Sequence, residues 1–118
     1  MLQAPASTWV DVCASDEILP NRGVCALVGG AQVAVFRVAA GADDEFLAIS
    51  NYDPFSKAFV LSRGIVGSKG DRLKVASPVY KQGFDLRTGE CLDDPAMGVP
   101  TFAVRVAEGR VEVASGAF

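Results

Sequence analysis

Histidine is absent from this 118-residue sequence, and its absence removes several kinds of chemistry. Ser-His-Asp and Cys-His catalysis both need an imidazole as the general base. A zinc or non-haem iron site would have to be built from cysteine and carboxylate side chains alone. The G-x-x-x-x-G-K-[ST] and G-x-G-x-x-G motifs are also missing, so the sequence does not predict a loop that cradles phosphate.

Cysteine is scarce, and the three that occur, Cys13, Cys25 and Cys91, form no C-x-x-C pair. An odd number of cysteines argues against a disulfide scaffold. Each of them lies among apolar neighbours, so we expect reduced, mostly buried thiols that act as small hydrophobic side chains. A cysteine nucleophile would normally need a histidine or another nearby cation to lower the pKa of its thiol, which disfavours that role.

Clustered positive charge and long apolar segments are missing as well. The chain has 11 lysines and arginines against 14 acidic residues, without the basic stripe that nucleic-acid binding favours. The longest apolar stretch, residues 24–36, contains two glycines and falls short of the roughly 20 residues that span a bilayer. Residues 1–7 lack the charged and apolar regions of a signal peptide, so we expect a cytoplasmic protein.

Short alternating segments separated by turn residues make up most of the chain. Strands are predicted at residues 9–13, 23–28, 32–37, 45–49, 72–76, 83–86, 90–92, 101–106 and 110–114. Three pairs of them are predicted to be hairpins, with turns at residues 29–31, 87–89 and 107–109. Ser15 is expected to cap a brief helical turn. The pattern is typical of one all-β domain, an antiparallel sandwich or small barrel over residues 1–118 with an ordered core of about 8–114.

Residues 50–71 follow neither the helical nor the strand period and are rich in Gly, Asn, Asp and Pro. A connection of this length inside a compact domain is usually functional. The candidate site is therefore expected in this stretch and in the loop after the strand at 72–76.

Two segments, residues 51–56 and 77–86, resemble the cluster-binding loops of a Rieske domain, which have the pattern C-x-H and later C-x-x-H. The ligand positions hold Asn51, Asp53, Ser77 and Tyr80, whereas a working cluster needs two thiolates and two imidazoles. The resemblance implies a Rieske-like fold with a degenerate cluster-binding subdomain at about residues 50–86. We expect hydrogen bonds, and the volume of side chains such as Tyr80, to replace the metal bonds.

An ordered set of residues over nearly the whole chain is similar to the small subunit of the assimilatory NAD(P)H-dependent nitrite reductases. The set comprises Trp9, Pro20, Gly23 and residues 51–55, 62–67, 76–82, 84–86, 88–89, 91–94 and 105–106. In that family the large subunit carries FAD, an iron–sulfur cluster and sirohaem, and reduces nitrite to ammonia in nitrogen assimilation. The resemblance implies that this chain holds no catalytic residue, cofactor or metal, and that its partner is the large subunit.

Several loop residues combine aromatic with cationic side chains, as is common at interface hot spots. We hypothesise that five of them contact the large subunit: Tyr52, Phe55, Arg63, Tyr80 and Lys81. Alternatively, the aromatic residues fill the space of the lost cluster, and Arg63 pairs with Asp53 or Asp85. Two other functions remain open: a free-standing structural or regulatory β-domain that binds another oxidoreductase, and a degenerate ferredoxin that still transfers electrons.

Overall fold

The structure is a computed structural model that describes residues 8–40 and 43–117. The expectations of loose ends, at the first six or seven and the last three or four residues, and of a polar loop at 41–44 fall partly on residues 1–7, 41–42 and 118, which lie outside the described residues. They are wrong for residues 43–44 and 115–117, which lie in strands. Eleven strands and two short 3-10 helices are described: β1 (Trp9–Ala14), η1 (Ser15–Glu17), β2 (Arg22–Val28), β3 (Ala31–Ala40), β4 (Asp43–Ser50), β5 (Tyr52–Asp53), β6 (Ala58–Phe59), η2 (Leu61–Arg63), β7 (Ile65–Lys69), β8 (Arg72–Ala76), β9 (Gly83–Asp85), β10 (Thr101–Ala107) and β11 (Arg110–Ala117). Neither helix of the described residues is long and apolar enough to cross a membrane.

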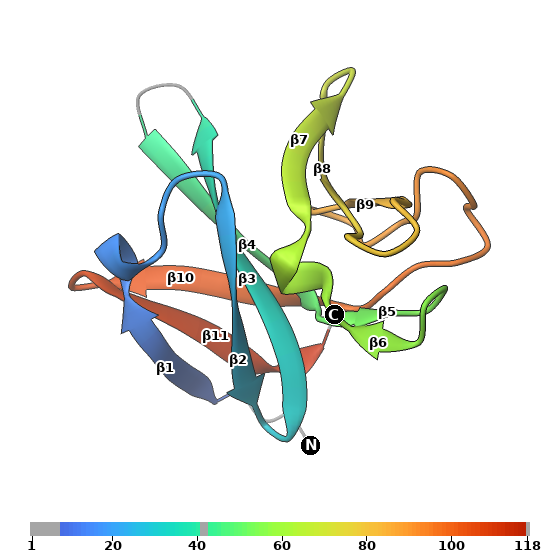
Figure 1. Cartoon of the computed structure of the whole chain (residues 1–118). Helices are drawn as coiled ribbons and strands as arrows, with labels where there is room; N and C mark the ends of the chain where they lie inside the picture. Colours follow the sequence, from blue (N-terminus) through green and yellow to red (C-terminus); the bar gives the residue numbers. More distant parts are fainter. Residues whose placement is uncertain (1–7, 41–42, 118) are drawn as a thin grey trace.

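Six strands form one large antiparallel sheet in the order β1-β11-β10-β4-β3-β2 (Figure 1). The sheet curls until β2 comes back against β11, which makes a nearly closed barrel. A three-stranded sheet, β7-β8-β9, and the β5-β6 hairpin lie beside it. This arrangement confirms the all-β antiparallel prediction.

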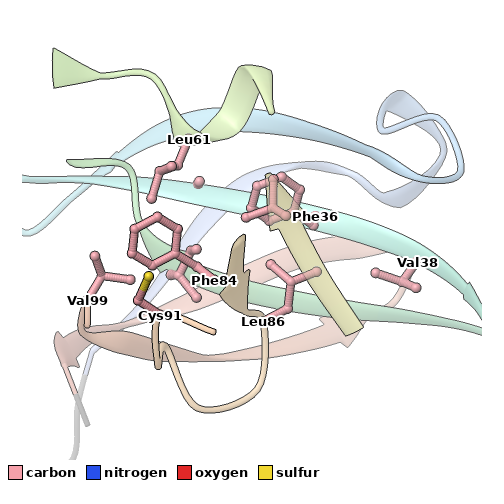
Figure 2. Close-up of a cluster of buried hydrophobic side chains, with 10 residues drawn as sticks. Phe36, Val38, Leu61, Phe84, Leu86, Cys91 and Val99 are labelled. Atoms are coloured by element: carbon pink, nitrogen blue, oxygen red, sulfur yellow. The ribbon is translucent and has the colours of Figure 1, made fainter. Parts of the chain in front are cut away.

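Strand β3 is buried on both of its faces, which explains why its sequence reads as a continuous apolar run. Val33 and Val35 belong to one core, inside the barrel, together with Val111 and Val113 of β11. The side chains of β3 that point the other way belong to a second core, which the smaller sheet covers (Figure 2). That core contains Ala34, Phe36, Val38, Ile49, Leu61, Val75, Phe84, Leu86, Cys91 and Val99. The candidate site therefore rests on β3.

Two predicted hairpins are confirmed, β2-β3 and β10-β11. Gly29 and Gly30 both have positive φ, 56° and 84°, which is the backbone that a tight turn between twisted strands requires. The predicted strand at 90–92 is wrong, because Phe84 and Cys91 form only an isolated bridge. The cap prediction is also wrong. Ala14 occupies the cap position and makes no side-chain cap bond, and its own N–H donates to Oε1 of Glu17 at 2.8 Å.

The stretch from 50 to 71 contains β5, β6, η2 and β7, which the sequence pattern did not predict. Two glycines let η2 pack tightly between the two sheets. A Cβ on Gly23 would lie 2.8 Å from the carbonyl oxygen of Ser62, and one on Gly64 would lie 2.4 Å from that of Ala76. Distances under 3.0 Å are too short for a real Cβ, so both positions require glycine. Arg63, the last residue of η2, is thereby held close to the start of β2.

Candidate functional site

Asp53 and Ser77, which stand at two of the four ligand positions, are hydrogen-bonded to each other. The hydroxyl of Ser77 donates to Oδ2 of Asp53 at 2.5 Å, and both residues are buried, with 0% and 1% exposure. The hydroxyl of Ser56 donates to the same oxygen at 2.9 Å, and the backbone N–H of Phe55 donates to Oδ1 at 2.9 Å. The expectation that hydrogen bonds join the two loops is correct for this pair.

These donors keep the buried carboxylate charged. Burial acts to raise the pKa of Asp53, but the hydroxyls of Ser77 and Ser56 and the backbone N–H groups of Phe55 and Ser56 outweigh it. The pKa therefore lies below its usual value. Ser56 was missed at the sequence level, because the turn pattern of an Asp predicts only the bond to the backbone N–H two residues on, which Phe55 makes.

Asn51, at the first ligand position, points to a different set of partners. Its Oδ1 accepts from the N–H of Ser62 at 2.7 Å, and its Nδ2 lies 3.4 Å from Sγ of Cys25 and 3.3 Å from Oε1 of Gln32. These contacts join β2 and β3 of the barrel to η2. Asn51 therefore holds the first loop against the barrel and makes no bond to the second loop.

Tyr80, at the fourth ligand position, is 61% exposed, so the expectation that it fills the cluster space is wrong. Its neighbour Val79 is 46% exposed, and Lys81 has a φ of 66°, which turns the chain back after the exposed segment. The space beneath the loops is filled by Phe55, which packs on the buried Phe84 with ring centroids 6.2 Å apart. Tyr52 instead packs against Phe59, which is 52% exposed, with the two rings tilted and their centroids 5.1 Å apart.

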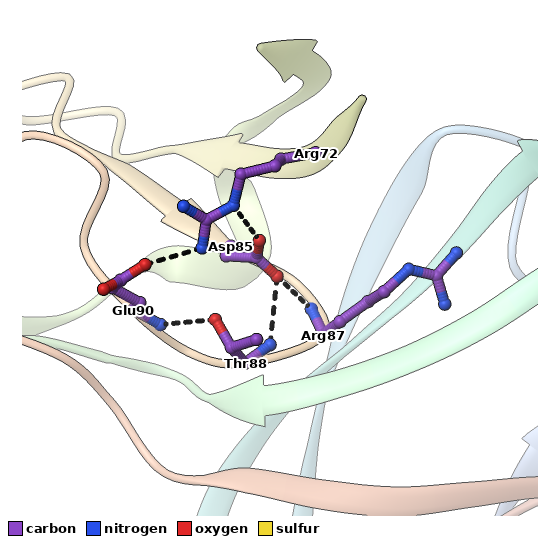
Figure 3. A network of polar contacts seen from close by, with 5 residues as sticks. All are labelled: Arg72, Asp85, Arg87, Thr88 and Glu90. Atoms are coloured by element: carbon purple, nitrogen blue, oxygen red, sulfur yellow. Dashed lines mark hydrogen bonds and ion pairs between the residues drawn. The ribbon is translucent and has the colours of Figure 1, made fainter. Parts of the chain in front are cut away.

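Arg63 pairs with neither Asp53 nor Asp85, so this part of the alternative to a partner contact is wrong. The partner of Asp85 is Arg72, whose Nε donates to Oδ2 at 2.7 Å while its NH2 group binds Glu90 at 2.6 Å (Figure 3). Oδ1 of Asp85 accepts from the N–H groups of Arg87 and Thr88, which closes the turn after β9 (Figure 3). Burial acts to raise the pKa of Asp85, but the guanidinium of Arg72 and these N–H groups hold it below its usual value.

The three cysteines differ in exposure more than expected. Cys91 is fully buried in the second core, but Cys13 is only half-buried and Cys25 is exposed. The prediction of mostly buried thiols is therefore wrong for Cys25, because its neighbours Val24 and Ala26 face the barrel core and its own side chain points to the opposite face of β2. Burial raises the pKa of the thiols of Cys13 and Cys25, which disfavours the thiolate needed for nucleophilic chemistry.

The residues at the four ligand positions do not fit a [2Fe–2S] cluster. They offer an amide, a carboxylate, a hydroxyl and a phenol where a Rieske cluster takes two thiolates and two imidazoles. Asp53 and Ser77 bind each other, Asn51 binds the barrel, and Tyr80 points to solvent. Within residues 8–40 and 43–117, no group of three or more His, Cys, Asp or Glu side chains is placed to hold a metal ion.

A barrel that carries a smaller sheet and two loops joined at ligand positions defines a Rieske-like domain. The family described as Rieske-like [2Fe-2S] domain matches residues 8–114. The nitrite reductase (NADH) small subunit of Salmonella typhimurium is 47% identical over 107 residues, which cover 91% of this chain and 97% of that subunit. The chain belongs to the family of NAD(P)H nitrite reductase small subunits.

Solved structures place the chain in the same fold. The NMR structure of the E. coli protein NirD has a TM-score of 0.84 at 45% identity, with 93% of this chain and 98% of that chain covered. The ferredoxin of carbazole 1,9a-dioxygenase from Nocardioides aromaticivorans has a TM-score of 0.76 at 28% identity, with 93% and 100% covered. The Rieske-like fold inferred from the two loops is thus confirmed.

A longer relative is also similar to this chain. The nitrite reductase [NAD(P)H] large subunit of Klebsiella oxytoca is 38% identical over 109 residues, which make up 92% of this chain but 11% of that protein. A domain of this kind therefore also occurs as part of a much longer nitrite reductase polypeptide.

Proposed function

We propose that this chain is the cofactor-free small subunit of an NAD(P)H-dependent nitrite reductase. In this proposal it supports a large subunit that carries FAD, an iron–sulfur cluster and sirohaem and reduces nitrite to ammonia for nitrogen assimilation in the cytoplasm. The hydrogen bond between Asp53 and Ser77 is the observation that carries the proposal. It joins the two loops by their own side chains at positions where a Rieske domain binds metal.

The Klebsiella relative supports a physical association with the large subunit. A segment similar to this chain forms part of that large-subunit polypeptide, where it is held permanently beside the rest of the enzyme. A separate subunit would have to reach the same place through a surface contact. We therefore propose that the large subunit is the direct partner of this chain.

The proposed contact surface, called here the loop surface, consists of the half-buried Tyr52, the exposed Phe59 of β6, and the exposed Val79, Tyr80 and Lys81 of the second loop. Phe59, Val79 and Tyr80 are 52%, 46% and 61% exposed. Exposed aromatic and aliphatic groups beside a cation resemble the composition of interface hot spots. Phe55 supports this surface from below by its contact with Phe84 and is not expected to touch the partner.

The test is co-expression of this chain, with an affinity tag, and the large subunit encoded in the same genome. We expect the large subunit to copurify, to be identified by mass spectrometry, and to oxidise NADH in the presence of nitrite with ammonia as product. Tyr80→Ala should weaken the complex about thirtyfold or more, because truncation of a hot-spot side chain costs at least about 2 kcal/mol. Leu27→Ala is the matched control, because Leu27 is 71% exposed on the barrel. Copurification of a different oxidoreductase would favour the alternative function as a regulatory domain.

The cofactor-free state has a separate test. Iron–sulfur reconstitution of the purified chain should leave its visible absorption unchanged, because the four ligand positions lack both thiolate and imidazole. Cluster absorption that stays with the protein through gel filtration would contradict this and would favour the degenerate ferredoxin.

A further inference from the structure

A groove lies between the beginning of β2 and the beginning of β7. It is a cavity of about 330 Å³, lined by Asn21, Arg22, Arg63, Gly64, Ile65 and Val66. A neighbouring cavity of about 190 Å³ continues it along β7 and shares Asn21 and Val66. Both β2 and β7 are edge strands, so the groove runs where neither sheet has a further strand to cover it.

The two arginines of the groove differ from the other arginines of the chain. Five arginines are neutralised by carboxylates of the same chain: Arg37, Arg72, Arg87, Arg105 and Arg110. The remaining two, Arg22 and Arg63, are exposed and form no ion pair within the described part of the chain. They come from positions far apart in the sequence and line the same groove.

The packing of η2 brings these two arginines together. Gly23 follows Arg22 and leaves no side chain between β2 and the carbonyl of Ser62, and Gly64 follows Arg63 and lies against the backbone of β8. Arg22 also faces Arg37 across the β2-β3 pair. Since Asp44 already pairs with Arg37 at 2.5 Å, the positive charge at this corner is only partly compensated.

An apolar side chain accompanies the two charges. Ile65, which also lines the groove, is 76% exposed and is the most exposed of the large hydrophobic residues described. A small free anion would gain nothing from such a neighbour. A protein segment with an acidic side chain next to an apolar one would cover Ile65 and pair with the guanidinium groups at the same time.

We propose that this groove binds an acidic segment of the large subunit, as a second contact in addition to the loop surface. The inference rests on the proposed function, because the partner is the one proposed there. It assigns Arg63, first expected among the loop residues, to the groove with Arg22 and Ile65. Guanidinium groups pair with carboxylates through two parallel hydrogen bonds, which fixes the orientation of the partner as well as attracting it.

Charge reversal tests the groove against a matched control. Arg22→Glu and Arg63→Glu each change the net charge by the same amount as Lys69→Glu, and Lys69 is an exposed residue at the far end of β7 that does not line the groove. The dissociation constant of each purified variant with the large subunit is measured at low and moderate salt. We expect a weakening of about tenfold or more for both arginine variants and less than about twofold for the control. Arg63→Lys, which keeps the charge, should fall between them.

The outcomes separate this inference from the proposed function. If the wild-type chain binds the large subunit and the arginine variants bind as Lys69→Glu does, the groove is not a contact although the proposed function stands. If the wild-type chain does not bind the large subunit at all, both fail. Equal unfolding free energies of the variants in urea show that an effect on binding is not an effect on folding.

Cross-linking identifies the acidic partner directly. Arg63→Lys places an amine in the groove, and a carbodiimide couples an amine to a carboxylate as an amide while it takes up the water that is lost. Mass spectrometry of the treated complex should find Lys at position 63 joined to an Asp or Glu of the large subunit. A cross-link from Lys69 but none from position 63 would overturn the proposal.

Discussion

The hydroxyl of Ser77 lies 2.5 Å from Oδ2 of Asp53, and this bond joins two residues that are 24 positions apart in the sequence. Both are buried, so the bond is not exposed to competition from water. In a cluster-bearing Rieske domain the metal joins the two loops. Here a serine and an aspartate do so, with Ser56 and the N–H of Phe55 completing the shell of donors around the carboxylate.

Removing the Ser77 hydroxyl should therefore weaken the contact between the two loops and lower the stability of the protein. Ser77→Ala leaves a buried carboxylate with one donor fewer, which costs about 1–3 kcal/mol of the free energy of unfolding. Urea denaturation followed by circular dichroism measures this change in the free energy of unfolding. Ser68→Ala is the control, because Ser68 is exposed on β7, and its effect should stay within about 0.5 kcal/mol. Equal effects of the two substitutions would contradict a role for the bond.

The depressed pKa of Asp53 predicts a loss of stability in acid. Its folded-state pKa lies below the unfolded value of about 3.9, so the charged carboxylate favours the folded state. This contribution is complete above about pH 5 and is lost as the pH falls through the folded-state pKa. Asp85 contributes in the same direction. The free energy of unfolding, measured from about pH 6 to 2, should fall less steeply for Asp53→Asn than for the wild type. Identical slopes would show that the two states bind the Asp53 proton equally.

The two glycines of the β7 region should respond to alanine in opposite ways. A Cβ on Gly64 would lie 2.4 Å from the carbonyl oxygen of Ala76 and 2.6 Å from Cγ2 of Val75, so the backbone itself must move. Gly67 has open space and no positive φ. We expect Gly64→Ala to destabilise the protein by several kcal/mol, whereas Gly67→Ala should be neutral or stabilise it by up to about 1 kcal/mol. Thermal unfolding of the two variants gives the comparison, and similar melting temperatures would contradict the packing of η2 described above.

Alkylation of the cysteines should follow their exposure. Iodoacetamide at about pH 8 should label Cys25 first and Cys13 more slowly, because one thiol is exposed and the other is half-buried. Cys91, with 0% exposure, should react only when the protein is unfolded in denaturant. Peptide mass spectrometry over a time course distinguishes the three. Early labelling of Cys91 would show that the second core opens in the native protein.

Much of the fold could be predicted from the sequence because its signals are local. The β2-β3 hairpin depends on Gly29 and Gly30, and glycine is the residue that most readily adopts the positive φ of a tight turn. Strands β5 and β6 have two residues each, too few to show a period. Strand β7 was missed because Val66 is the only one of its side chains packed against a core.

The candidate site was also predicted only in part, because some of its features depend on local residues and others on contacts between distant segments. The four ligand positions were identified through the resemblance of the two loops to those of a Rieske domain, and the bonding between the loops could be expected from their polar side chains. The direction of Tyr80 could not, because it depends on how the loop leaves β8 and turns back at Lys81. The pairing of Asp85 with Arg72 instead of Arg63 depends on the register of β8 and β9, which no local pattern records.

Strands β1 and β11 pair side by side, with Trp9 opposite Ala114, so the described chain enters and leaves the barrel at neighbouring points. A domain with this geometry can be inserted into a longer polypeptide or joined to its end without separating any strands of the sheet. The Klebsiella polypeptide contains a segment similar to this chain, and the Salmonella relative is a separate small subunit. The same barrel is therefore compatible with covalent attachment to a large subunit and with existence as a separate chain. Fusing the large subunit to either end of this chain by a flexible linker would make the contact intramolecular. Its strength would then depend on the effective concentration that the linker sets and not on the protein concentration.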